Sequence, residues 1–380
     1  MKERKNKILF VSRDSGGTNA VTPVIKKLIS SSDFNVKVFA SGSAEKIFAN
    51  KNIPFISLNN YNVNEFKIED AEKIIKSENP SIVITGTSLN DNSENYFRWV
   101  AKKFGIPTVS ILDQWMNYMQ RFQCIKENLE CIPDIICVMD RVAKDDMIKE
   151  GFKSDRIEIT GNPYFDDIFS LKENFNEEKV SKFRRLLNVN RDEFLITFAS
   201  EPIENSEEEN HEIRNEWGYT EKTVISYLLT ALENISFRKN LKICLIIKLH
   251  PREIKSNFDK IKRGFSSKNV RIIINHNADP RKLILSSDLI AGMTSIFLIE
   301  SVLLEKLTIS LQPESKKPDF LITNRVSASI GVYKREDIEP LVEKMIFDKE
   351  FQEDTLKRGK LFNVKGSATD NILKKIYEII

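Results

Sequence analysis

Residues 160–168 read TGNPYFDDI, and they interrupt an alternation of apolar and amphipathic segments that starts again after them. Gly161, Asn162 and Pro163 form turns, so no strand continues through this segment. On either side, short apolar runs are separated by longer amphipathic stretches, which predicts two α/β domains, each with a parallel sheet. Because domains usually contain about 100–200 residues, two are expected in a chain of 380 residues.

The first half predicts a doubly wound sheet. Continuous apolar runs, such as residues 81–85, are typical of strands that are buried on both faces. We expect strands near 7–12, 35–40, 81–86, 107–112 and 134–138, and helices near 18–30, 69–77, 91–104 and 141–150. The same pattern in the second half predicts strands near 194–199, 241–248, 270–274, 288–291 and 307–311, and helices near 176–187, 219–236, 253–262, 279–286, 294–304, 335–347 and 349–361.

Two further segments do not fit the alternation. The acidic stretch between Pro202 and Tyr219 predicts a long loop, either a lid or, as we favour, a mobile connection. The last amphipathic segment, near 367–380, predicts a helix with an apolar side at Ile372, Leu373 and Ile376. Such a helix needs a surface to cover.

The composition is that of a soluble globular protein, with 41% hydrophobic and 30% charged residues. The net charge of +3 is a small difference between 58 basic and 55 acidic residues, so no nucleic-acid partner is expected. The apolar run at residues 8–11 is too short for a signal peptide, and no run approaches a spanning helix. We therefore expect a cytoplasmic protein and leave a peripheral membrane association open.

Metal and cofactor chemistry is not expected. The four cysteines lack a CxxC pair, the three histidines lack HxxxH spacing, and no DxD motif is present. We interpret the cysteines Cys124, Cys131, Cys137 and Cys244 as reduced and structural.

Ligands of open α/β sheets bind beyond the carboxyl ends of the strands, so polar residues there are the candidates. After the first strand come Asp14, Gly16, Gly17 and Asn19. The two glycines allow a tight turn, and Thr18 or Asn19 can cap the next helix and leave N–H groups free for an anion or a sugar. A capped turn without a ligand explains this segment equally well, and the GxGxxG fingerprint is absent.

A second group follows the strand near 107–112. Asp113 is followed by Trp115, Asn117, Tyr118 and Arg121. A carboxylate at a strand end beside aromatic rings can act as a general base in a desolvated site. Alternatively, the aspartate caps a helix and the rings belong to the core, but the clustering favours a function.

Two segments of the second half suit a phosphate. His250 follows the apolar strand ICLIIK, and Pro251 suits the first turn of a helix, so His250 and Arg252 are expected to meet an anion at a helix start. Gly292, Thr294 and Ser295 follow another strand and place hydroxyls and N–H groups at a helix start, although an ordinary cap explains them alone. Weaker candidates are Ser200 and Glu201 after the strand near 194–199, and His276 after the strand near 270–274.

On the basis of these motifs, the chain resembles the GT-B superfamily of nucleotide-sugar enzymes. TGNPYFD at 160–166 is similar to the interdomain segment of that superfamily, and GSATDNILKKI at 366–376 is similar to its last helix. HPRE at 250–253 with GMTS at 292–295 resembles the paired motifs of bacterial sialyltransferases, Kdo transferases and CDP-glycerol glycerophosphotransferases.

The resemblance implies a GT-B-like fold of two Rossmann-like domains facing a cleft. It implies an acceptor domain at 1–166, a nucleotide-donor domain at 167–365, and a helix at 366–380 that crosses back to the first domain. It also implies that His250, Thr294 and Ser295 hold the donor phosphate, with Arg252 and Glu300 as further candidates.

Two departures from family patterns matter. The acidic motif that supplies the base in the sialyltransferases is absent, so we assign that role to Asp113 or, failing that, to Asp14. UDP-N-acetylglucosamine 2-epimerases are also similar, but their double glycine followed by Gln and two Glu reads GMTSIFLIE here, at 292–300. The second glycine and the Gln are missing, which disfavours an epimerase.

The resulting hypothesis is a metal-independent, inverting glycosyltransferase of surface polysaccharide or glycoconjugate synthesis. It would use a nucleotide-sugar donor, CMP or CDP rather than UDP, and a glycan or other hydroxyl acceptor. The alternatives are a nucleotide-sugar epimerase or hydrolase, and a module that binds a nucleotide sugar without catalysis.

Overall fold

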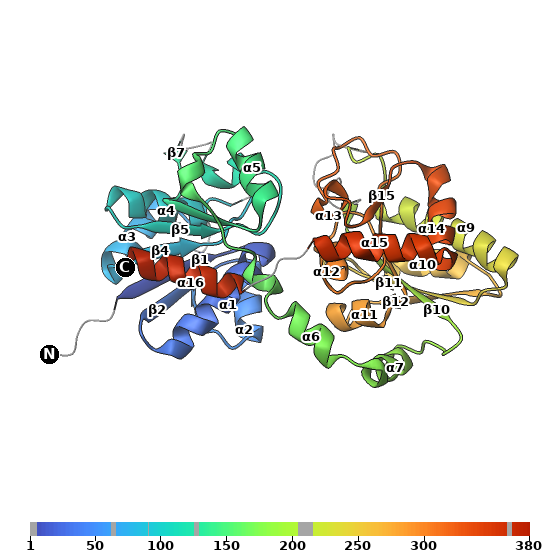
Figure 1. Ribbon diagram of the computed structural model, residues 1–380. Coiled ribbons are helices and arrows are strands. Elements are labelled where there is room, and N and C mark those ends of the chain that lie inside the picture. The colour runs from blue at the N-terminus through green and yellow to red at the C-terminus, as the bar shows by residue number, and fades with distance from the viewer. Residues whose placement is uncertain (1–5, 62–65, 90, 125–128, 204–215, 363–366) are drawn as a thin grey trace. The chain divides into compact units, whose positions relative to one another are not determined.

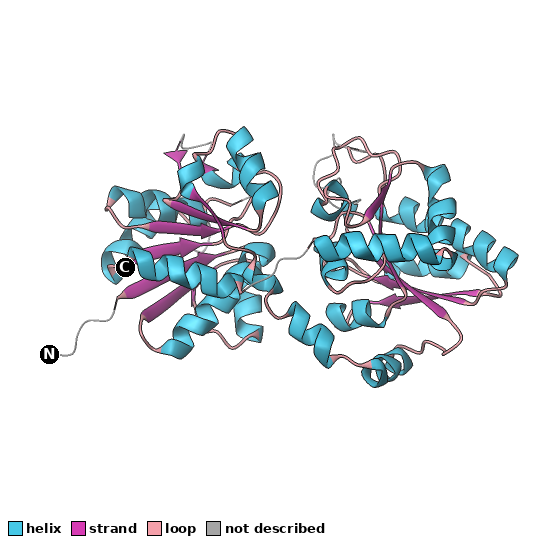
Figure 2. Ribbon diagram, in the orientation of Figure 1, coloured by secondary structure: helices cyan, strands magenta, loops and turns pink. Residues whose placement is uncertain are grey.

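The computed structural model describes residues 6–61, 66–89, 91–124, 129–203, 216–362 and 367–380. The chain forms two compact units, one of residues 1–166 with 364–380 and one of residues 167–363. In each unit a parallel sheet lies between layers of helices, as Figures 1 and 2 show. The expected class of two doubly wound α/β domains is therefore confirmed.

Unit 1 contains a parallel sheet of seven strands. Its strands, in spatial order, are β3 (Ile56–Ser57), β2 (Asn35–Ala40), β1 (Lys7–Ser12), β4 (Ile82–Thr85), β5 (Thr108–Ile111), β8 (Ile135–Val138) and β9 (Ile157–Ile159). Its helices are α1 (Ser15–Ser31), α2 (Ser43–Asn50), α3 (Ile68–Glu78), α4 (Ser93–Lys103), α5 (Arg141–Lys149) and α16 (Ala368–Ile379). A separate hairpin pairs β6 (Gln123–Cys124) with β7 (Leu129–Glu130).

Alternate side chains of the central strands point to opposite faces of this sheet. Ile8 and Phe10 of β1 pack in a cluster with α1, α2 and α16, while Leu9 and Val11 pack in a cluster with α3 and α4. Both faces of β1 are thus buried, which is why its sequence KILFVS is almost continuously apolar.

The last helix, α16, packs on unit 1, where Ile372, Leu373 and Ile376 join the cluster of α1. Asp166 anchors its first turn, because its two carboxylate oxygens each accept one backbone N–H, from Ala368 and Thr369, at 2.9 Å. The apolar side of this helix is therefore buried against α1 and its neighbours, as its amphipathic sequence requires.

Unit 2 contains a parallel sheet of six strands. Their spatial order is β12 (Val270–Asn275), β11 (Ile243–Lys248), β10 (Phe194–Ala199), β13 (Leu289–Gly292), β14 (Thr308–Leu311) and β15 (Ile330–Val332). The helices are α6 (Ile168–Asn174), α7 (Glu177–Leu186), α9 (Glu221–Lys239), α10 (Ser256–Gly264), α11 (Pro280–Ser286), α12 (Ile296–Leu303), α13 (Ile322–Arg325), α14 (Ile338–Phe347) and α15 (Lys349–Leu361). One face of the sheet forms a core with α9 and α14.

Both sheets reverse their strand order near the centre. The chain adds strands outward from β1 on one side and then returns to place β4 on the other, and β10 and β13 have the same relation in unit 2. At such a switch point the connections leave in opposite directions and open a crevice at the carboxyl ends of the strands. The structure therefore has two positions, one in each unit, where this fold type binds ligands.

Part of the expected loop between Pro202 and Tyr219 lies outside the described residues, at 204–215. No helix in the described ranges has the length and apolarity needed to cross a bilayer.

Candidate functional site

The switch point of unit 2 brings together most of the residues that the sequence suggested for a donor phosphate. The register pairs Ala199 of β10 with both Lys248 of β11 and Gly292 of β13. The segments after these three strands therefore start side by side. Each carries candidate residues, namely Ser200 and Glu201, His250 and Arg252, and Thr294 and Ser295.

Glu253 connects the first two of these segments. Its carboxylate accepts the hydroxyl of Ser200 at 2.7 Å and the backbone N–H of His250 at 2.6 Å. Burial raises the pKa of Glu253 above its ordinary value, against the hydrogen bond from Ser200. Glu253 was not expected as a site residue, although it lies three residues after His250 and its side chain closes the turn there.

His250 is neutral at neutral pH and has a defined tautomer. Burial, with the charges of Arg252 and Lys248, lowers the pKa of its imidazole to about 4. Its Nδ1 accepts the backbone N–H of Arg252 at 3.2 Å, so the ring proton is assigned to Nε2. His250 can thus donate one neutral hydrogen bond from Nε2.

The expectation that a helix starts at His250 is wrong. Residues 251–252 form a turn, and α10 begins only at Ser256. The turn closes because the backbone N–H of Glu253 donates to the carbonyl of His250 at 2.9 Å while its side chain holds the N–H of His250. A helix dipole therefore does not support an anion at His250, and Arg252 lies exposed on this turn.

The second expected helix start is present. Ser295 caps α12, and its hydroxyl accepts the backbone N–H of Phe297 at 3.3 Å. Gly292 ends β13 with no room for a larger residue, since an added Cβ would lie 3.2 Å from the carbonyl oxygen of Ala199 and 3.1 Å from Leu298. Thr294 and Ser295 thus place two hydroxyls and the first backbone N–H groups of the helix start at the switch point.

That helix start already has an anionic neighbour. The carboxylate of Glu201 accepts the backbone N–H of Thr294 at 2.6 Å and its hydroxyl at 3.0 Å. Burial raises the pKa of Glu201 to about 7, although the hydrogen bonds from Thr294 lower it.

His276 and Glu300 lie less centrally. His276 is exposed after β12, and its carbonyl accepts the ammonium of Lys248 at 2.8 Å. Glu300 is buried in α12 and pairs with Arg281 at 2.7 Å, so its charge is already matched within unit 2.

The switch point of unit 1 brings Asp113 against the first turn of α1. Asp113 is only 5% exposed, and its carboxylate accepts the hydroxyl of Thr87 at 3.0 Å, with the guanidinium of Arg121 at 3.6 Å. Burial raises the pKa of Asp113, while Arg121 and Thr87 oppose that change. An added Cβ on Gly16 would lie 1.9 Å from this carboxylate, so the glycine is what lets the two segments meet.

Asp14 also lies at this switch point. The expectation that Thr18 or Asn19 caps α1 is wrong. The helix begins at Ser15, so Thr18 and Asn19 lie inside it, and the hydroxyl of Thr18 bonds the carbonyl of Asp14 at 2.7 Å. The backbone N–H of Asp14 donates to the hydroxyl of Ser88 at 3.3 Å. Asn19 accepts a hydrogen bond from Lys51 at 3.3 Å instead of capping.

Gly17 also allows two segments to approach closely at this edge, because an added Cβ there would lie 3.0 Å from the backbone nitrogen of Thr87.

The aromatic residues near Asp113 belong to the interior of unit 1, since Trp115 and Tyr118 are buried. The indole of Trp115 donates to Asp140 at 2.8 Å, and Arg121 donates to the carbonyl of Thr87 at 2.5 Å. Asn117 has a φ of 56°, in the left-handed region, and forms the turn after β5.

A third carboxylate at this edge was not expected from the sequence. Glu94 of α4 is 1% exposed, and it accepts the backbone N–H of Ser88 at 2.5 Å. Burial raises its pKa to about 7, against the charge of Arg98. A general base works best when its pKa is near the operating pH, so Glu94 belongs with Asp113 among the candidates. No local motif marks it, because its contact depends on how α4 packs.

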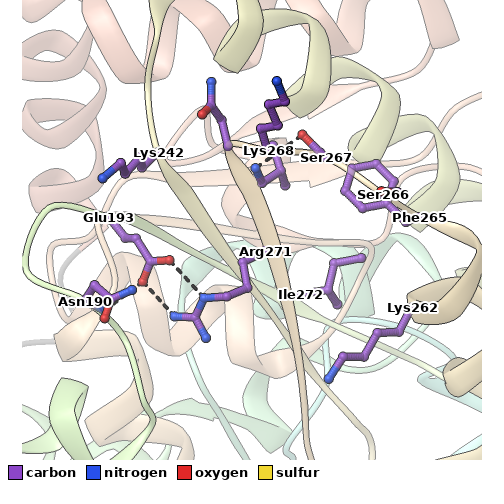
Figure 3. A pocket seen from close by; sticks show the side chains of 12 residues that line it. Asn190, Glu193, Lys242, Lys262, Phe265, Ser266, Ser267, Lys268, Arg271 and Ile272 are labelled. Atoms are coloured by element: carbon purple, nitrogen blue, oxygen red, sulfur yellow. Dashed lines mark hydrogen bonds and ion pairs between the residues drawn. The ribbon is translucent and has the colours of Figure 1, made fainter.

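A polar pocket of about 480 Å³ lies at the opposite, amino edge of the sheet of unit 2. Figure 3 shows Glu193 and Arg271 joined by ion pairs on its wall. Lys242 pairs with Asp192 at 2.7 Å. These charges are matched internally and lie away from the switch point.

Comparisons with known proteins address the fold. No protein-family model matches the chain, and no curated protein matches it. Among solved structures, the UDP-GlcNAc 2-epimerase from Neisseria meningitidis bound to UDP-GlcNAc matches with a TM-score of 0.68 and 16% identity, over 98% of this chain and 100% of that one. A glycosyltransferase from Rickettsia africae matches with a TM-score of 0.67 and 18% identity, over 99% and 98%.

The chain has a GT-B-like fold. HepE from Anabaena, in complex with UDP-glucose, is a further match with a TM-score of 0.64 and 13% identity, over 98% of this chain and 99% of that one. At these identities the likeness concerns the fold alone. It does not single out the sialyltransferase and Kdo transferase branch that the HPRE and GMTS motifs suggested.

Proposed function

We propose that this GT-B-like protein is a metal-independent, inverting glycosyltransferase that uses a nucleotide-activated sugar. Unit 2 binds the donor and unit 1 binds a glycan or another hydroxyl acceptor. The observation that carries the proposal is the set of donors at the switch point of unit 2, where Nε2 of His250 and the hydroxyls of Thr294 and Ser295 follow β11 and β13, the two strands that flank β10. These groups are neutral donors that suit a diphosphate.

In this mechanism the donor groups stabilise the negative charge that grows on the departing nucleotide phosphate. Preorganised donors that point to developing charge are worth about 10²–10³ in rate each. Asp113 accepts the proton of the attacking acceptor hydroxyl, and its buried carboxylate with a raised pKa is suited to that role. Asp14 is the second choice for the base.

The nucleotide is a pyrimidine nucleotide in this proposal. The HPRE and GMTS motifs favour CMP or CDP, whereas the similar structures are named as complexes of UDP-GlcNAc and UDP-glucose. A thermal-shift panel of CMP, CDP, UDP and GDP decides between the bases, because a ligand that binds the native state raises its apparent stability. If none of the four raised the melting temperature, the donor site would be wrong.

A second candidate function is epimerisation or hydrolysis of a nucleotide sugar. It is favoured by the several UDP-GlcNAc 2-epimerases among the similar structures. The two reactions differ in one requirement, since an epimerase or hydrolase consumes the donor without an acceptor. Incubating UDP-GlcNAc with the protein alone, followed by chromatography, separates them. Conversion without acceptor would overturn the transferase, and binding without conversion under any condition would indicate a non-catalytic module.

The synthesis of surface polysaccharide or glycoconjugates, in the cytoplasm and with peripheral association to a membrane, remains the setting that we propose. The test is fractionation of cells between soluble and membrane pools, with and without high salt.

A further inference from the structure

The side chain of Glu201 occupies the place where the proposed function requires a phosphate. Ala199 and Gly292 are partners in the register of β10 and β13. Glu201 and Thr294 each lie two residues further along, so they leave the sheet side by side. The carboxylate of Glu201 accepts the N–H of Thr294 at 2.6 Å and its hydroxyl at 3.0 Å.

A phosphate at the start of α12 would use the same donors. The free N–H groups of a helix start, with the hydroxyl of a flanking Thr or Ser, bind an anion because they point outward along the positive end of the helix dipole. Thr294 has one N–H and one hydroxyl, and both are already engaged by Glu201. Two anions on one donor set also repel each other.

We propose that Glu201 is an internal competitor for the donor phosphate. Its carboxylate holds the start of α12 in the free protein, and the nucleotide binds after this carboxylate has taken up a proton. The inference rests on the proposed function, because it concerns the same donor site.

The surroundings of Glu201 favour proton uptake. Burial is the largest influence and raises the pKa of Glu201 to about 7, with a further increase from the charge of Glu253 after β11. The hydrogen bonds from Thr294 and Ser295, before α12, act in the opposite direction. The phenol of Tyr219, before α9, is also a neighbour of Glu201, because the charge of Glu201 contributes to the raised pKa of this phenol. The negative charge of a bound phosphate at this position shifts the protonation equilibrium of Glu201 further toward the neutral carboxyl.

The experiment compares the native chain with Glu201→Gln, which keeps the size and one acceptor oxygen but removes the charge. CDP and UDP are titrated into both by calorimetry near pH 6 and near pH 8.5. Because each protein meets the same ligand, the ionisation of the nucleotide cancels in the ratio of the two dissociation constants. Asp348→Asn is the matched control, since Asp348 caps α15 through the N–H of Phe351 and lies away from the switch point.

With a pKa of about 7, the competent fraction of the native chain falls as the pH rises. Glu201→Gln is therefore expected to bind about as tightly as the native chain near pH 6 and roughly 30-fold more tightly near pH 8.5. Asp348→Asn should follow the native chain at both pH values. Equal affinities of Glu201→Gln and the native chain near pH 8.5, or weaker binding by the variant, would contradict the role of Glu201 as a competitor. They would not contradict the proposed donor site.

A measurement on the native chain alone tests the proposal even if the variant does not fold. Titrations near pH 8 in two buffers with different ionisation enthalpies give the number of protons taken up with the nucleotide. Uptake approaching one proton supports the competitor, and uptake of none contradicts it. If neither CDP nor UDP bound to the native chain or to Glu201→Gln at either pH, the proposed function itself would fail, and the competitor with it.

Discussion

The two switch points are built on the same topology but differ in what the chain places on them. In each, the carboxylate after the first strand of the unit accepts a backbone N–H from the segment after the strand across the reversal: Asp14 accepts from Leu89 at 3.3 Å, and Glu201 accepts from Thr294 at 2.6 Å. At unit 1 two more carboxylates, Asp113 and Glu94, gather under the start of α1. At unit 2 one more carboxylate, that of Glu253, lies near the acid. The other groups at this edge include the hydroxyl of Thr294 and the neutral imidazole of His250.

In the proposed function, this difference corresponds to a division of roles. Carboxylates with raised pKa values are suited to accepting a proton, whereas hydroxyls, N–H groups and a neutral His are suited to holding a phosphate. Because the two crevices share one topology, we propose that their side chains decide which one activates a hydroxyl and which one binds an anion. The following changes test that division, beginning with the largest expected effect.

Asp113→Asn should reduce turnover by about 10²–10⁴, because the amide cannot accept the proton of an acceptor hydroxyl. The thermal shift with nucleotide should not change, since the donor residues belong to unit 2. Release of nucleotide from the donor measures the rate. Asp134→Asn is the matched control, because Asp134 accepts hydrogen bonds from Thr108 at the other end of the same sheet. Unchanged turnover in Asp113→Asn would remove this residue from the mechanism.

Gly16→Ala should destabilise the protein by about 1–3 kcal/mol, because the new methyl group would lie 1.9 Å from the carboxylate of Asp113 and must displace it. Chemical denaturation measures the loss, and turnover should fall with it. In Gly264→Ala the methyl group meets no atom within 4 Å, so that variant should retain the stability of the native chain. A neutral Gly16→Ala would show that the carboxylate is not held against α1.

Glu94→Gln should change how stability depends on pH. The pKa of Glu94 is raised to about 7 in the folded chain, above the ordinary value of 4.5, so its folded form binds a proton that the unfolded chain has lost. Its contribution is therefore complete below about pH 4.5 and is lost as the pH rises through 7. Relative to the native chain, the variant should gain about 1–3 kcal/mol between pH 5 and pH 8. Parallel melting curves at both pH values would contradict the raised pKa.

His250→Ala should weaken nucleotide binding by only about 3–10-fold at neutral pH, because a neutral imidazole donates one ordinary hydrogen bond. Calorimetry with CDP and UDP measures the affinity. Lys268→Ala serves as the control, since Lys268 is exposed and lies before β12, at the opposite edge of the same sheet. A loss of 100-fold or more would mean that His250 is charged in the complex, contrary to its lowered pKa.

The sequence predicted the sheets well where a strand is buried on both faces. The bounds of β1, β2 and β10 agree with the expected strands, and β1 and β10 are mostly apolar and buried along almost their whole length. The expected elements did not include β15 (Ile330–Val332) or α2 (Ser43–Asn50). A strand of three residues with a central glycine has no apolar run, and a helix of eight residues shows little more than two turns of periodicity.

The candidate sites were predictable only as positions along the strands. Strand ends locate Asp113, His250 and Thr294, because the topology brings the carboxyl ends of neighbouring strands together. Glu94 could not be located in this way, since it lies inside α4 and reaches Ser88 through tertiary packing. The late start of α10 at Ser256 has a similar cause: the side chain of Glu253 binds the backbone of His250 and closes a turn first.

The anchoring of α16 by Asp166 has a consequence for the order in which the protein is made. Unit 2 consists of one uninterrupted stretch, 167–363, whereas unit 1 needs residues from both sides of it. A ribosome that has just passed residue 363 has synthesised all of unit 2 but has not yet made the helix that covers Val24 and Ile25 of α1. Unit 1 is thus begun before unit 2 and completed after it, and its apolar face stays uncovered until residues 368–379 have been made.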